Sequence, residues 1–129
     1  MSNFSFLPTQ WSALAPTLHQ AEQHVYTAAP YAAVLCRKAL EEWVRWLYEH
    51  DEDLEQPFDT TLNSLLHQPK MRELLAPSLL RQVNLVRKLG NDAAHGTLTI
   101  RPEQALHVLQ LLHGFAAWVV NMYSAERVS

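Results

Sequence analysis

The stretch Pro30–Glu49 reads PYAAVLCRKALEEWVRWLYE, and it indicates the fold class of this 129-residue chain. Its apolar side chains recur every three or four residues, the spacing of one helix face, at Cys36, Leu40, Trp43 and Leu47. Beside this stripe runs a ladder of charged residues spaced by four, which consists of Arg37, Glu41, Arg45 and Glu49. Pro30 suits the first turn of a helix, where an amide hydrogen would have no partner. The stretch therefore predicts one long amphipathic helix.

The rest of the chain shows the same helical spacing, and no part of it alternates apolar and polar residues over a sustained length. We predict an all-α fold in which residues 1–129 form a single bundle of about five main helices. Besides the helix after Pro30, the predicted helices are Trp11–Val25 (kinked or divided at Pro16), two short pieces over 60–76 broken at Pro69, one from Pro77, and a long one from Pro102 whose apolar face ends at Met122.

Two glycines and two connections complete this prediction. Gly90 either ends a helix as a left-handed cap or lets a neighbouring helix approach closely. Gly114, inside the last helix, predicts close contact with another helix. The acidic run His50–Pro57 predicts a solvated loop, and Thr97–Ile100 predicts a short connection.

Composition narrows the functional classes. The length suits one domain, and a charged fraction of 18% beside 48% hydrophobic residues argues against disorder. Three scattered glycines exclude a glycine-rich phosphate loop, and the single Cys36 permits neither an internal disulfide nor a thiolate zinc site. The start of the chain lacks a signal-peptide pattern, and no run of about 18 uninterrupted apolar residues occurs. We expect a soluble cytoplasmic protein that is neither exported nor membrane-spanning.

The net charge of −3 is unevenly divided. Residues 1–65 carry three basic against nine acidic residues, whereas residues 66–129 carry seven basic against four acidic residues. The negative total argues against a protein that binds nucleic acid through its overall charge, whereas the basic half allows a local nucleic-acid contact surface. Its candidate contact residues are Lys70, Arg72, Arg81, Arg87, Lys88 and Arg101.

The most unusual local pattern places Arg87, Asn91 and His95 at positions i, i+4 and i+8. On a continuous helix they share one stripe, where an arginine clamps a phosphate, an amide orients it and an imidazole transfers a proton. The alternative is a hydrogen-bond network that ties helices together. Arg37 and Glu41 form a second candidate, which either lies in solvent or reaches into the bundle to hold another polar residue.

The sequence predicts no metal or cofactor site in this segment. The seven histidines show no HxxxH spacing and no Cys/His cluster. Cys36 lies on the apolar stripe, so we interpret it as a core residue rather than a nucleophile. Trp43, Trp46, Trp118 and Tyr123 fall at helical spacing, which favours core packing over base stacking.

Three segments together resemble the N-terminal helical domain of type I restriction enzyme R subunits. They are the opening SNFSFL, the segment Arg37-Lys38-Ala39-Leu40-Glu41, and Leu89-Gly90-Asn91-Asp92-Ala93-Ala94-His95 before a long final helix. The resemblance covers essentially the whole chain, and LGNxAxH with an arginine just upstream is its most specific part. It implies a polar signature at Arg37, Glu41, Arg87, Asn91 and His95.

This resemblance implies a docking role inside a larger enzyme. The R subunit is the motor and nuclease of a complex with methyltransferase and specificity subunits, and it uses ATP and Mg²⁺ to translocate and cleave duplex DNA. Neither nuclease nor helicase motifs occur in these 129 residues. We therefore expect a fragment or a truncated relative that binds partner subunits or duplex DNA and does not itself hydrolyse ATP or cut DNA.

The chain also resembles, more distantly, the HEPN superfamily of helical bundles. Some of its members are metal-independent ribonucleases or defence toxins that use an arginine and a histidine, often across a homodimer. The alternative function is therefore a ribonuclease that uses Arg87 and His95, with Asn91 between them. In a third possibility, Arg37, Glu41, Arg87 and Asn91 only connect the helices of the bundle.

Overall fold

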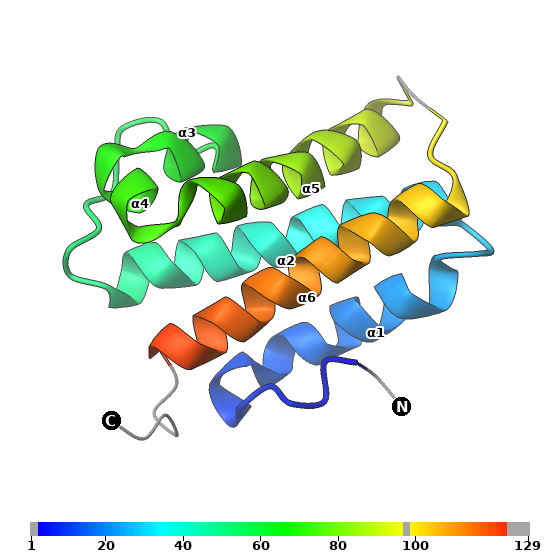
Figure 1. Cartoon of the computed structure of the whole chain (residues 1–129), viewed down its shortest axis with the longest axis horizontal. Coiled ribbons are helices and arrows are strands. Elements are labelled where there is room, and N and C mark those ends of the chain that lie inside the picture. The colour runs from blue at the N-terminus through cyan, green and yellow to red at the C-terminus, as the bar shows by residue number, and fades with distance from the viewer. Residues whose placement is uncertain (1–2, 97–98, 124–129) are drawn as a thin grey trace.

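The computed structural model describes residues 3–96 and 99–123, and every regular element within these ranges is a helix (Figure 1). A 3-10 helix, η1, leads into six α-helices, so the predicted all-α bundle is confirmed. Ser2, Thr97 and Leu98, which belong to the patterns above, lie outside the described residues. The elements are η1 (Thr9–Leu14), α1 (Ala15–His24), α2 (Ala29–His50), α3 (Leu62–His67), α4 (Pro69–Leu74), α5 (Pro77–His95) and α6 (Pro102–Tyr123).

Prolines mark the helix starts, as the sequence predicts. Pro16 lies in the first turn of α1, so it begins a second helix after η1 rather than kinking one long helix. Pro30, Pro69 and Pro77 occupy the same position in α2, α4 and α5. The start of α3 is capped instead by Thr61, whose hydroxyl accepts a hydrogen bond from the Ser64 amide at 3.2 Å.

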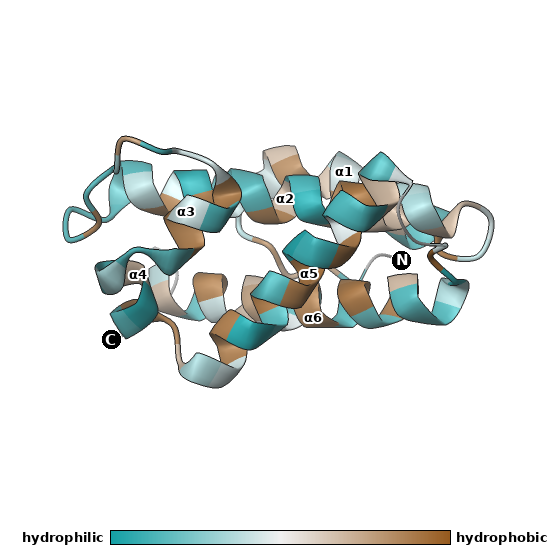
Figure 2. Cartoon of the chain, turned by 90° about the horizontal axis from the view of Figure 1, so that it is seen from above, coloured by the Kyte–Doolittle hydropathy of each residue, from teal (hydrophilic) through white to brown (hydrophobic). Residues whose placement is uncertain are grey.

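Helix α2 lies at the centre of the bundle and packs against α1, α5 and α6. Figure 1 shows α5 on one side of it and α1 on the other, and Figure 2 shows α6 opposite α1 and α2. Because three helices surround α2, it buries more than the single stripe that its periodicity predicts. Trp43 is fully buried and meets Phe115 of α6 edge-on, with ring centroids 6.2 Å apart.

Helix α6 is long and apolar enough to cross a membrane by length and composition, criteria that the core helix of a soluble protein also meets. Val108, Leu112, Phe115 and Val119 are fully buried in the bundle. Met122 continues the predicted apolar face into the last turn of α6, but it is 39% exposed there. In the same turn Val120 and Tyr123 are packed against the core.

The loop after α2 agrees only in part with the predicted solvated loop. Glu52, Asp53 and Glu55 are exposed, but Leu54 is buried. Asp51 accepts a hydrogen bond from the Tyr123 hydroxyl at 2.7 Å, which joins the loop to the end of α6.

The three glycines have different roles. Gly90 lies in α5 against α2, where a Cβ would collide with the Cβ of Arg37 and lie 3.1 Å from the Ala33 carbonyl oxygen. Close helix approach is thus the correct alternative for Gly90, and the left-handed cap of α5 is Gly96, with a φ of 66°. The close contact predicted at Gly114 is wrong, because nothing lies within 4 Å of a Cβ placed there.

Alanine substitutions at the two helical glycines should change stability in opposite directions. Gly114→Ala should raise the free energy of unfolding by about 1 kcal/mol, because alanine favours the helix and meets open space. Gly90→Ala should lower it by roughly 1–2 kcal/mol, because overpacking against Arg37 outweighs the same propensity gain. Urea unfolding of both variants measures the difference, and equal stabilisation of both would contradict the close packing at Gly90.

Cys36 is fully buried in α2, as its place on the apolar stripe predicts. Burial, with a smaller contribution from the Glu22 carboxylate, raises the pKa of its thiol to about 12. The thiolate that reacts with electrophiles is therefore scarce in the folded protein.

The folded protein should accordingly resist alkylation by iodoacetamide at pH 8.5. In guanidinium chloride the unfolded chain should react like an ordinary thiol, whose pKa is about 8.5. Mass spectrometry of time points gives both rates. Rapid labelling of the folded protein, before any unfolding, would contradict the burial of Cys36.

Candidate functional site

A polar cavity of about 320 Å³ lies where α2, α5 and the start of α3 meet. We call it the arginine cavity, because three of its lining residues are arginines. The lining residues are Arg37, Glu41, Arg45, Thr61, Leu62, Asn63, Arg87 and Asn91. The structure thus brings together four of the five residues in the polar signature, from helices about fifty residues apart in sequence.

Glu41 is held by the two arginines that flank it on α2. The Arg45 guanidinium donates to Glu41 Oε2 from Nε at 3.1 Å and from Nη2 at 2.8 Å. Arg37 Nη1 lies 3.6 Å from Glu41 Oε1. These side chains are neither fully solvated nor buried, since Arg37 and Glu41 are 29% and 30% exposed. The first three members of the predicted ladder are therefore paired, and they form one wall of the cavity, whereas Glu49 is not among the lining residues.

Arg87 forms the opposite wall on α5. Its Nε donates to Asn84 Oδ1 at 3.3 Å, and partial burial lowers the pKa of its guanidinium below the ordinary value. An arginine pKa starts so high that the group stays charged at neutral pH. Three guanidinium groups against one carboxylate leave the lining with a formal charge of +2.

Many of the cavity's hydrogen-bond donors have no acceptor. Among the described residues, Arg37 Nε is buried without a partner, and Arg87 makes no hydrogen bond from its two terminal nitrogens. Within the same ranges no hydrogen bond or ion pair joins α2 to α5 across the cavity. Each guanidinium carries five N–H donors, so the cavity has capacity for an anionic ligand.

His95 lies outside the arginine cavity. It is the last residue of α5 and is exposed, eight residues or about 12 Å of helix rise beyond Arg87. The stripe of Arg87, Asn91 and His95 exists, but only its first two members line the cavity. The ribonuclease alternative, which needs Arg87 and His95 together, stays a prediction.

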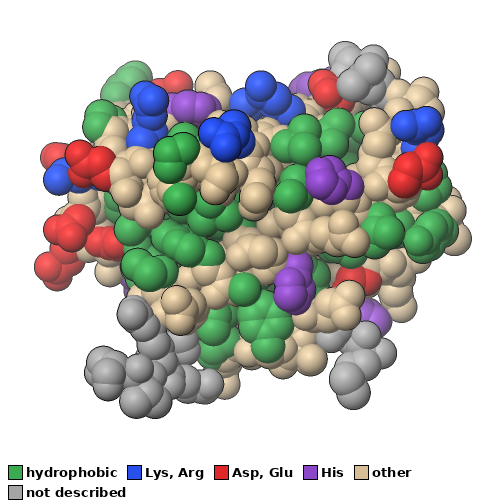
Figure 3. Space-filling model, viewed as in Figure 1, with side chains coloured by type: hydrophobic (Ala, Val, Ile, Leu, Met, Phe, Trp, Pro, Cys, Tyr) green, Lys and Arg blue, Asp and Glu red, His purple; other side chains and the backbone are tan. Residues whose placement is uncertain are grey.

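The other candidate nucleic-acid contacts are spread over the surface. Lys70 lies 3.7 Å from Glu73, and Arg101 lies 3.5 Å from Glu103. Arg72, Arg81 and Lys88 are exposed on α4 and α5. Figure 3 shows basic side chains along the edge formed by α5 and acidic ones gathered near the loop after α2.

The sequence did not single out several residues that line this cavity, nor an exposed aromatic residue that precedes them in the chain. Arg45 has a place in the charged ladder, but nothing local indicates that it faces Arg87. Thr61 and Asn63 reach the cavity only because α3 folds back toward α2. Phe58, in the loop before them, is entirely exposed, with a relative exposure of 106%. Sequence reasoning could have noticed Phe58 as a single aromatic residue within an acidic linker.

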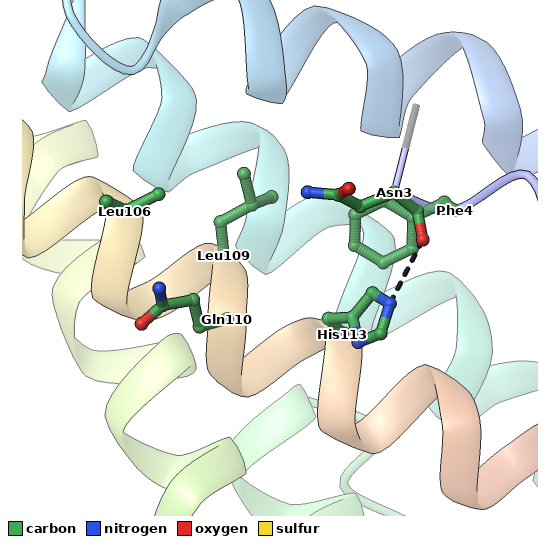
Figure 4. A pocket seen from close by; sticks show the side chains of 6 residues that line it. All are labelled: Asn3, Phe4, Leu106, Leu109, Gln110 and His113. Carbon is green, nitrogen blue, oxygen red and sulfur yellow. Dashed lines mark hydrogen bonds between the residues drawn. The ribbon is translucent and has the colours of Figure 1, made fainter. Parts of the chain in front are cut away.

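A second cavity, of about 290 Å³, lies between the N-terminal segment and α6 (Figure 4). His113 donates from Nε2 to the Asn3 carbonyl oxygen at 3.0 Å, and its ring lies against Phe4 and Phe6. No arginine, lysine or carboxylate lines this cavity. Within the described ranges, no group of three or more His, Cys, Asp or Glu residues has the arrangement of a metal site. The arginine cavity is therefore the stronger candidate site.

Comparison with known proteins places the chain in a family. No curated protein and no solved structure matches it. A family model described as "Domain of unknown function (DUF4145)" matches residues 19–127, a range that contains every residue of the arginine cavity. The match covers most of the chain, and the chain therefore belongs to the DUF4145 family.

Proposed function

We propose that this chain is a docking domain that binds nucleic acid through the arginine cavity and does not itself catalyse a reaction. The observation that carries this proposal is the convergence of three guanidinium groups whose only acidic neighbour in the lining, Glu41, is already held by two of them. Guanidinium groups bind phosphate oxygens in a planar, two-pronged geometry.

The chemistry of the lining supports binding rather than bond breaking. Guanidinium and amide groups donate hydrogen bonds, but they neither gain nor lose a proton at neutral pH, so they do not act as general acids or bases. The lining contains no histidine or cysteine, and Glu41 is engaged by Arg45 at 2.8 Å. A ligand in this cavity would be held and oriented by Arg37, Arg87 and Asn91.

The resemblance to type I restriction R subunits supports the proposed setting. Arg37, Glu41, Arg87 and Asn91 of the polar signature are the residues that line the cavity. We propose that the domain works in the cytoplasm within such an assembly, beside methyltransferase and specificity subunits. ATP and Mg²⁺ would be bound by other parts of that assembly.

Binding to duplex DNA should be salt-dependent and should require Arg87. If about two phosphates are contacted, raising NaCl from 50 to 200 mM should weaken binding roughly tenfold. Arg87→Gln should lower the affinity and reduce the slope of log K against log salt by about 1. Fluorescence anisotropy with a labelled duplex measures both quantities.

The matched control is Arg101→Gln, which removes the same charge from a residue that pairs with Glu103 outside the cavity. It should leave binding nearly unchanged. Absence of duplex binding would favour a protein partner, salt-insensitive binding would contradict the phosphate contacts, and an equal loss in both variants would remove the cavity from the proposal.

The stability of Arg87→Gln tests whether the cluster only connects helices. Because the hydrogen bond that Arg87 donates to Asn84 stays within α5, its loss should change the free energy of unfolding by no more than about 0.5 kcal/mol. Thermal or urea unfolding gives the value. A loss of 2 kcal/mol or more, the size expected on breaking a buried network, would support a structural role instead.

A further inference from the structure

We infer that the arginine cavity binds the terminal phosphate monoester of a nucleic-acid strand and that Phe58 stacks on the base beside it. This inference rests on the proposed function and names its ligand. It depends on three features: the convergence of hydrogen-bond donors, the charge of the lining, and an exposed aromatic ring three residues before Thr61 of the lining.

The hydrogen-bond donors of the lining surround one cavity and are not arranged in a row along the surface. Arg37 and Arg87 approach the cavity from two helices, and Asn63 and Asn91 add amide groups from α3 and α5. Arg45 is fixed by Glu41 and by the Thr60 carbonyl oxygen, to which its Nη2 donates at 3.2 Å. A tetrahedral phosphate presents oxygens in several directions at once, so it can accept hydrogen bonds from the remaining donors of Arg37 and Arg87.

The charge of the lining matches a monoester better than an internal phosphodiester. A phosphate monoester carries a charge of about −1.5 to −2 at pH 7. An internal phosphodiester carries a single negative charge, whereas the lining has a formal charge of +2. The cavity volume of about 320 Å³ lies at the small end of the range for ligand pockets, roughly 300–1,000 Å³, which suits a compact group.

Phe58 precedes the lining residue Thr61 by three positions, in a loop that hydrogen bonds hold. Asp59 Oδ1 accepts from the Thr61 amide at 3.0 Å, and Thr61 then caps α3. Only three residues of chain, about 10 Å at full extension, separate Phe58 from Thr61 in the lining. An exposed aromatic ring beside a basic site is a platform on which any base can stack.

The test compares two labelled single strands that differ only in a 5′-phosphate or a 5′-hydroxyl, with the intact chain at fixed salt. The phosphorylated strand should bind roughly tenfold more tightly, and inorganic phosphate should compete for its binding. Arg87→Gln and Arg37→Gln should bring the two affinities close together, whereas Arg101→Gln should keep the difference. Phe58→Ala should weaken both strands severalfold and leave their ratio unchanged.

The comparison of strands with the unaltered protein needs no variant, so a variant that misfolds does not affect it. Equal affinity for the two strands would overturn the inference, as would equal competition by a phosphoserine peptide. A closed circular duplex has no ends, so its binding distinguishes a failure of end recognition from a failure of the proposed function. If the circle binds as tightly as the phosphorylated strand and depends on Arg87, nucleic-acid binding holds and end recognition fails.

Discussion

The approach of α2 and α5 at Gly90 is the contact on which the structure depends. Because Gly90 has no side chain, the stem of Arg37 lies directly against the backbone of α5. Helix α2 can then pack against α5 while α1 and α6 cover its other sides. The same contact places an arginine of α2 on the cavity that Arg87 lines from α5. Helix packing and site assembly thus share one residue pair.

The arginine cavity gathers like charges that a stable fold has little reason to bring together. Like charges at short range repel, and partial burial reduces the screening that water provides. Glu41 offsets part of this repulsion by pairing with Arg37 and Arg45, but the lining keeps a net positive charge. A net positive cavity with unfilled donors is characteristic of a site that is completed by an anion.

The fold could be predicted from sequence because its signals are local. Apolar spacing identified the helices, and prolines located their starts, including the break at Pro69. The roles of the glycines depended on their neighbours: Gly90 and Gly114 both lie within helices, but only Gly90 faces another backbone. Sequence alone could not decide between them.

The site could be predicted only in part, because its assembly depends on contacts between segments that are distant in sequence. A helical stripe gives the side on which Arg87, Asn91 and His95 lie, but not how far along the helix a cavity extends. The lining extends along α5 only to Asn91, and His95 lies one turn further, at the end of the helix. Arg45 and Asn63 join it through the return of α3 to α2, a contact between distant segments. The division of charge between the two halves of the sequence persists only in part in the folded chain, because α2 and α5 lie side by side (Figure 1).

The hydrogen bonds that join the two ends of the described chain bear on the order of folding. His113 holds the Asn3 carbonyl, and the Gln10 side chain donates to the Tyr123 carbonyl oxygen, contacts that span 110 and 113 positions. Such distant contacts form late, because closing long loops loses chain entropy before the contacts compensate for it. Both bonds are exposed, and exposed peripheral bonds open at low free energy. Transient opening of the molecule should therefore begin where its two ends meet, while the pair of α2 and α5 stays closed.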